Sequence, residues 1–109
     1  MTEIVYRNTS LYQEMQLSGH AGDRTVCAGI SAISQTLIAN LLKEESRNDL
    51  RLQWTMNEPG EIWMRAWTTK KNREAIRAMF AFTAEGLRKM AEDYPGNLEL
   101  KEENGNGNV

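Results

Sequence analysis

Two short segments near the start of the chain alternate between apolar and polar residues. Residues 3–7 read EIVYR and residues 11–17 read LYQEMQL, and the polar residues RNTS connect them. In the second segment Leu11, Met15 and Leu17 share one face, on which Gln13 is the exception. Because the side chains of a strand point alternately to its two faces, this pattern predicts an antiparallel hairpin with one covered face.

Two longer segments carry apolar residues at the spacing of a helix. A helix is predicted over residues 24–45, and its apolar stripe consists of Ile30, Ile33, Leu37 and Leu41. A second helix is predicted over residues 69–93 and ends before a Pro-Gly pair, because neither residue continues a helix well. Its stripe consists of Ile76, Met79, Phe80, Thr83, Leu87 and Met90.

The first of these helices contains a charge-free stretch, residues 25–42, that is long enough to suggest a membrane span. Five polar residues interrupt it, namely Ser31, Ser34, Gln35, Thr36 and Asn40. Such side chains are costly in the hydrocarbon interior of a bilayer. We therefore interpret the stretch as the buried central helix of a small domain and expect no contact with a membrane.

A second hairpin is predicted between the two helices. Residues 49–56 place Leu50, Leu52, Trp54 and Met56 on one face, and NEPG at 57–60 is a turn sequence. The return strand, residues 61–67, directs Ile62, Met64 and Ala66 to one face and Trp63, Arg65 and Trp67 to the other. The second trio indicates either a partner surface, since Trp and Arg are enriched in binding hot spots, or a sheet face covered by the second helix or the tail.

The predicted elements fit into one domain of 109 residues. A short strand over residues 97–100 completes the order ββαββαβ, and residues 101–109 are expected to form a disordered polar tail. The predicted fold class is α+β: a single domain over residues 1–100, in which two long helices pack on an antiparallel or mixed sheet.

Composition narrows the possible functions. Thirteen Lys and Arg residues against fifteen Asp and Glu give a net charge of −2, which makes nucleic acid an unlikely partner. A basic cluster of Lys70, Lys71, Arg73 and Arg77 is interpreted as a solvated face, with RNA contact as the alternative. One cysteine and one histidine exclude an internal disulfide and a Cys-based metal cluster, so neither metal nor cofactor is expected. The unpaired thiol and the absence of a signal-peptide pattern favour the cytoplasm.

The single histidine and the single cysteine lie in one segment, GHAGDRTVC at residues 19–27. Cys27 falls in the predicted first turn of a helix, whose positive end stabilises a thiolate and whose free N–H groups can stabilise an oxyanion. His20 can accept the thiol proton, and Gly19 and Gly22 leave room for a substrate. The alternative is that Cys27 is a small buried hydrophobic residue without chemistry.

Two further residues have both a chemical and a structural interpretation. Ser31 lies one turn beyond Cys27 on the same helix face, where it can bond the thiolate or the substrate, or bond back to the preceding turn. Asp23 can orient His20 as the third member of a triad, or it can cap the helix. The two roles of Asp23 are not exclusive.

These residues resemble the ribosomal-processing cysteine proteases of bacteria, the Prp family. The resemblance is carried by GHAG at 19–22, by VCAGISAISQT at 26–36, and by the helix and strand of GLRKMAEDYPGNLEL. It implies a homodimeric cysteine endopeptidase that removes a short N-terminal extension from a large-subunit ribosomal protein. Cleavage in the family follows an aromatic or apolar residue and precedes a small one. By position, His20 is the general base, Cys27 the nucleophile and Ser31 a supporting residue.

The sequence departs from the family between the histidine and the cysteine. This segment is several residues shorter than is usual, and Arg24 stands where the family has an Asp, with Asp23 one position earlier. A short connection predicts an ordered segment 19–27 and an open cleft, with His20 within about 4–6 Å of Cys27. Two alternatives stay open: a protease for a phage or mobile-element protein, and a non-catalytic dimeric module that binds a ribosomal protein or nascent ribosome.

Overall fold

The computed structural model describes residues 1–47, 50–57 and 60–105. Its elements follow the order that the sequence predicts. They are β1 (Thr2–Asn8), β2 (Tyr12–Ser18), α1 (Arg24–Arg47), β3 (Arg51–Asn57), β4 (Glu61–Trp67), α2 (Arg73–Asp93) and β5 (Leu98–Asn104). The predicted turn at 57–60 includes residues 58 and 59, which lie outside the described residues.

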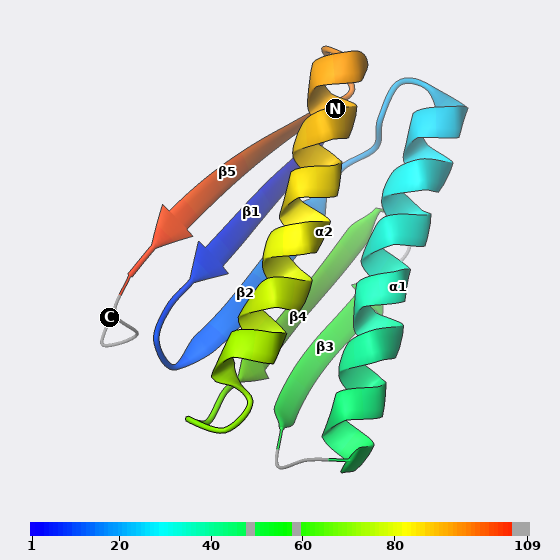
Figure 1. Cartoon of the computed structure of the whole chain (residues 1–109). Coiled ribbons are helices and arrows are strands. Elements are labelled where there is room, and N and C mark those ends of the chain that lie inside the picture. Colours follow the sequence, from blue (N-terminus) through cyan, green and yellow to red (C-terminus); the bar gives the residue numbers. More distant parts are fainter. Residues whose placement is uncertain (48–49, 58–59, 106–109) are drawn as a thin grey trace.

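The five strands form one sheet in the order β3-β4-β2-β1-β5. β5 pairs with β1 in parallel, and all other neighbours are antiparallel, so the sheet is mixed. Both helices lie side by side on one face of this sheet, with α2 packed against β5 and β2 and α1 against β3 and β4 (Figure 1). The predicted α+β fold class is confirmed.

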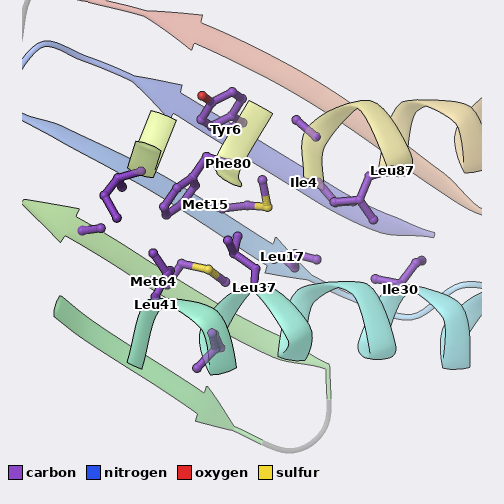
Figure 2. Packing of buried hydrophobic residues seen from close by; sticks show 14 of the residues in the cluster. Ile4, Tyr6, Met15, Leu17, Ile30, Leu37, Leu41, Met64, Phe80 and Leu87 are labelled. Atoms are coloured by element: carbon purple, nitrogen blue, oxygen red, sulfur yellow. The ribbon is translucent and has the colours of Figure 1, made fainter. Parts of the chain in front are cut away.

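The core lies between the helix pair and the sheet (Figure 2). The ring of Tyr6 stacks on that of Phe80 with centroids 6.1 Å apart, and Met15 and Met64 from neighbouring strands are fully buried. Gln13, the exception in the alternating pattern, also faces this core and accepts a hydrogen bond of 2.5 Å from the Tyr6 hydroxyl. A buried polar side chain is therefore tolerated there because it has a partner.

Three apolar residues that the pattern assigns to the core face are instead exposed. Leu11 precedes β2 in the turn, and its exposed fraction is 42%. Trp54 and Met56 do face the helix side of β3, but they are 42% and 39% exposed. The reason is their position: β3 is the outermost strand of the sheet, where a neighbouring strand and a full helix face are both lacking on one side.

The last strand is longer than the sequence predicts. β5 runs to Asn104 and pairs with β1 from Thr2↔Leu98 through Asn8↔Asn104. The expectation of a disordered tail from residue 101 is therefore wrong for residues 101–104. The strand continues because β1 offers seven residues of free edge, and every backbone pair that forms there satisfies two polar groups. Residues 106–109 of the expected tail lie outside the described residues.

Helix α1 is long and apolar enough to cross a membrane by length and composition. In this fold it packs on the sheet through one face, which carries Val26, Ile30, Leu37, Ile38 and Leu41. Its opposite face is exposed, with small residues such as Ala28, Ala32 and Ala39. The expected burial of a central helix thus applies to one face of α1 only.

The face of the sheet opposite the helices carries the Trp63, Arg65 and Trp67 trio. Coverage by the second helix is wrong, because α2 lies on the other face (Figure 1). The guanidinium of Arg65 lies 4.5 Å from the Tyr12 ring centroid and 5.4 Å and 5.8 Å from those of Trp67 and Trp63. It also forms an ion pair with buried Glu14 at 2.5 Å. These side chains therefore cover much of one another.

Candidate active site

His20 follows a glycine that ends strand β2. Gly19 has a φ of +89°, a conformation that residues with a Cβ rarely adopt. A Cβ at this position would also lie 2.6 Å from the carbonyl oxygen of Met1, well inside contact distance. Gly19 therefore lets the chain leave β2 close to the start of β1. His20, the next residue, is exposed at this end of the sheet.

Helix α1 begins immediately after Asp23, which caps it. The Asp23 carboxylate accepts hydrogen bonds from the backbone N–H groups of Thr25 at 2.7 Å and Val26 at 3.2 Å. Its carbonyl oxygen accepts one from the N–H of Cys27 at 3.0 Å. The N–H of Asp23 in turn donates to the Asn97 side chain at 2.9 Å, which ties the start of α1 to the start of β5.

The cap decides between the two predicted roles of Asp23 and also engages the backbone amides at the start of α1. Its carboxylate binds the helix, and no hydrogen bond between Asp23 and His20 occurs in the described part of the chain, so the cap is the role that the structure supports. The N–H groups of Thr25, Val26 and Cys27 are already engaged. The expectation that these amides are free to stabilise an oxyanion therefore does not hold for the uncomplexed protein.

The sulfur of Cys27 and the imidazole of His20 face one another. Cys27 Sγ lies 4.0 Å from His20 Nδ1, within the range that the short connection predicts. The cysteine is half-buried and the histidine exposed, so both can be reached from solvent. When the imidazole carries its proton on Nε2, Nδ1 is free to accept the thiol proton. The alternative of Cys27 as an inert, buried hydrophobic residue is not supported.

Gly60 holds the imidazole from the other side. It has a φ of +73°, and a Cβ there would lie 3.0 Å from both Cε1 and Nε2 of His20 and 2.7 Å from the carbonyl oxygen of Gly19. The β3–β4 hairpin therefore packs its backbone directly against the histidine. The sequence alone does not reveal this role, although the turn sequence NEPG marks residue 60 as a position that favours glycine.

A cleft of about 140 Å³ opens beside the cysteine and the histidine. One wall is the face of α1 that carries Cys27, Ser31 and Gln35 at intervals of four residues. The opposite wall comes from the β3–β4 hairpin, and the base from β1 and β2. The lining residues are Thr2, Leu17, Gly19, His20, Cys27, Ile30, Ser31, Gln35, Met56, Asn57, Gly60, Glu61 and Ile62.

The cleft separates the predicted site residues into two groups. Gly19 and Ser31 line it together with His20 and Cys27. No hydrogen bond of the Ser31 hydroxyl occurs among the described residues, whereas Ser34 bonds back to the carbonyl of Ile30 at 2.8 Å. Gly22 is not a lining residue, and a Cβ there would meet only the Asn97 side chain at 3.7 Å, an ordinary contact.

The described residues contain no group of three or more His, Cys, Asp or Glu side chains that could hold a metal ion. Within the cleft, the thiol of Cys27 and the imidazole of His20 are a nucleophile and a base that lie close together. A thiol within reach of a base, at the mouth of an open cleft, is the arrangement of a nucleophilic cysteine hydrolase.

Comparison with known proteins agrees with this class. A sequence model of the family described as cysteine protease Prp matches residues 1–99, so the chain belongs to this family and is a cysteine protease. No curated protein matches the chain.

Solved structures share the fold. SMU.848 from Streptococcus mutans is 23% identical, with a TM-score of 0.67 and 95% of each chain covered. The essential ribosomal processing protease Prp from Staphylococcus aureus, bound to a covalently linked product peptide, is 19% identical with a TM-score of 0.68. That match covers 94% of this chain and all of the other. The same enzyme with a substrate peptide has a TM-score of 0.68 at 16% identity.

Proposed function

We propose that this protein is an endopeptidase that removes a short N-terminal extension from a bacterial large-subunit ribosomal protein. The observation that carries the proposal is the approach of Cys27 Sγ to His20 Nδ1 at 4.0 Å in an open cleft. The S. aureus relative with this fold is a ribosomal processing protease, which supports the substrate class.

The reaction follows from the two side chains. His20 Nδ1 takes the proton of the Cys27 thiol, and the thiolate adds to the scissile carbonyl carbon to form a tetrahedral oxyanion. The C–N bond then breaks, and the imidazolium returns its proton to the leaving amine. Water, deprotonated by His20, attacks the resulting thioester. The second fragment leaves as a carboxylic acid, and the thiol of Cys27 is restored.

Ser31 is the supporting residue in this proposal. Its hydroxyl lines the cleft one turn from Cys27 and has no backbone partner of its own among the described residues. It is placed to donate a hydrogen bond to the oxyanion or to the thiolate. Gly19 borders the substrate through its backbone, and Asp23 acts indirectly by fixing the start of the helix that carries Cys27.

We also propose that the enzyme is a homodimer of the cytoplasm. The side chain of Phe82 is 84% exposed and borders a groove of about 440 Å³ between α1 and α2. A protruding ring beside a groove can pair with its own copy about a two-fold axis. A nucleophilic thiol must stay reduced, which suits a reducing compartment. Sedimentation at micromolar concentration tests the dimer: Phe82→Glu is expected to give monomers, and a monomeric wild type would overturn it.

The first test of the proposed function uses the single thiol of the chain. Iodoacetamide is expected to alkylate Cys27 at pH 7 more than about tenfold faster than glutathione, and His20→Ala is expected to slow the reaction. Gly22→Ala is the matched control. Gly22 lies near the site, and the added Cβ would make only an ordinary contact with the Asn97 side chain, so the substitution is expected to leave the geometry of His20 and Cys27 unchanged. A thiol that reacts only after denaturation would refute the proposal.

The second test concerns the substrate. The protein is incubated with a large-subunit ribosomal protein that carries its N-terminal extension and with the same protein lacking it. Removal of the extension by the wild type, and not by Cys27→Ala, is the expected result. A reactive Cys27 without cleavage of either protein would favour another protein substrate, such as one encoded by a phage.

A further inference from the structure

Among the described residues, strand β3 (Arg51–Asn57) forms one edge of the sheet and pairs with β4 alone. About half of the backbone N–H and C=O groups of such a strand point away from its neighbour and are free to bind another strand. Every residue of β3 except Leu52 is exposed. This edge is therefore accessible along its whole length.

The two edges of the sheet differ in charge. Strand β5 at the other edge carries four charged residues in seven, namely Glu99, Lys101, Glu102 and Glu103. Charged side chains on an edge strand discourage the pairing of further strands. β3 carries a single charge, that of Arg51. The β3 edge therefore lacks the charged side chains that discourage strand pairing at the β5 edge.

The open edge leads into the active-site cleft. Met56 and Asn57, the last residues of β3, line the cleft together with His20 and Cys27. On the helix side of the same strand, Trp54 and Met56 are 42% and 39% exposed. Large apolar side chains that stay this exposed beside a nucleophile offer a surface for alternate side chains of a bound peptide.

We infer that the substrate binds as an added β-strand along the free edge of β3, which brings its scissile bond to Cys27. The peptide backbone pairs with β3, and every second peptide side chain lies against Trp54 and Met56. A strand rises about 3.3 Å per residue, so the seven residues of β3 can pair with a substrate segment of about six residues. The inference rests on the proposed protease activity and adds its recognition mode: the enzyme takes extended chain and not folded structure.

The experiment begins with a library of random decapeptides, digested by the wild type and by Cys27→Ala. The decapeptide that the wild type cleaves fastest is then methylated at one backbone nitrogen at a time. Strand addition predicts that kcat/KM falls about three- to tenfold at every second position on one side of the scissile bond, with the positions between them tolerated. Losses confined to the residues flanking the scissile bond would overturn strand addition. Absence of any cleaved peptide would overturn the proposed function itself, and strand addition with it.

A second measurement observes β3 directly. Hydrogen exchange of Cys27→Ala is recorded with and without that decapeptide. The amides of residues 51–57 that point away from β4 are expected to exchange at about one third of the free rate or slower in the complex. The amides of β5 serve as an internal control and stay unchanged. Unchanged exchange in β3 while the peptide is bound would contradict the inference.

A pair of variants separates this surface from general stability. Trp54→Ala is expected to raise the KM for the decapeptide about three- to tenfold, with the alkylation rate of Cys27 unchanged. Leu11→Ala is the matched control, because Leu11 is exposed to the same fraction, 42%, but lies in the turn before β2. Equal KM values for the two variants would count against β3 as the binding edge.

Discussion

Replacing Gly60 by alanine tests whether the β3–β4 hairpin positions His20, the proposed general base. The added Cβ would lie 3.0 Å from two atoms of the His20 ring, a few tenths of an ångström inside an ordinary contact, and 2.7 Å from the carbonyl oxygen of Gly19. The exposed ring can move, and the Gly19 carbonyl belongs to the residue just before His20. Relief of either contact is therefore expected to shift the imidazole relative to Cys27. Misplacement of a catalytic group by about 1 Å can lower the rate about 100-fold.

The same substitution carries a second cost that must be separated from the first. Gly60 has a φ of +73°, and an alanine in this region costs about 1–2 kcal/mol of folding free energy. Gly96→Ala is the matched control: its φ is +86°, but nothing lies within 4 Å of the added Cβ. Both variants should therefore lose this amount in denaturant titrations, and Gly60→Ala should lose more, because its Cβ also meets the Gly19 carbonyl oxygen at 2.7 Å.

Only Gly60→Ala is expected to lose activity. Its kcat for peptide cleavage and its rate of Cys27 alkylation at pH 7 should fall about tenfold or more, while Gly96→Ala stays within about twofold of the wild type. The reasoning would be refuted if Gly60→Ala folded with the expected loss of stability and kept the wild-type alkylation rate. It would also be refuted if the two variants lost activity equally.

Three further predictions concern stability. Asp23→Ala removes the helix cap and is expected to lower the free energy of unfolding by about 1 kcal/mol in urea titrations. Glu14→Ala leaves the partly exposed guanidinium groups of Arg65 and Arg7 without their buried partner. We expect a loss of about 2 kcal/mol with the alkylation rate of Cys27 unchanged; a loss below about 1 kcal/mol would contradict the role of this carboxylate. Burial raises the pKa of Tyr6 to about 12, so the stability that its neutral hydroxyl confers is fully present below pH 10 and is lost between pH 10 and 12. Tyr6→Phe should flatten that decline, measured by thermal unfolding, even though it loses the hydrogen bond to Gln13.

The helices, the strands and the approach of His20 to Cys27 could be predicted because their signals are local. A period of two or of 3.6 residues reports on the segment that carries it, and the α1 and α2 stripes are visible without any knowledge of their neighbours. His20 and Cys27 are seven residues apart with a short connection, so the chain itself limits their separation. Their approach to 4.0 Å depends on the turn at Gly19 and the helix cap at Asp23, and both residues lie within the segment 19–27.

The rest of the site could not be predicted because it comes from segments remote in sequence. Gly60 and Met56 reach the cleft only because β4 pairs with β2, which places the β3–β4 hairpin beside the end of β2. Neither residue carries a chemical signal, since a turn glycine and an apolar strand residue have many ordinary uses. The hydrogen bond from the N–H of Asp23 to the Asn97 side chain likewise joins two segments that are 74 residues apart.

The alternating and helical patterns of the sequence by themselves determined seven elements and their order, and the short segment 19–27 placed His20 near Cys27. Tertiary structure decided what each element meets: which strands became edges, which face of the sheet the helices cover, and how far β5 extends along β1. The physical reason is that side-chain periodicity encodes which residues share a face, whereas backbone pairing satisfies N–H and C=O groups that every residue carries alike. The choice of pairing partner therefore depends on the packing of the whole domain.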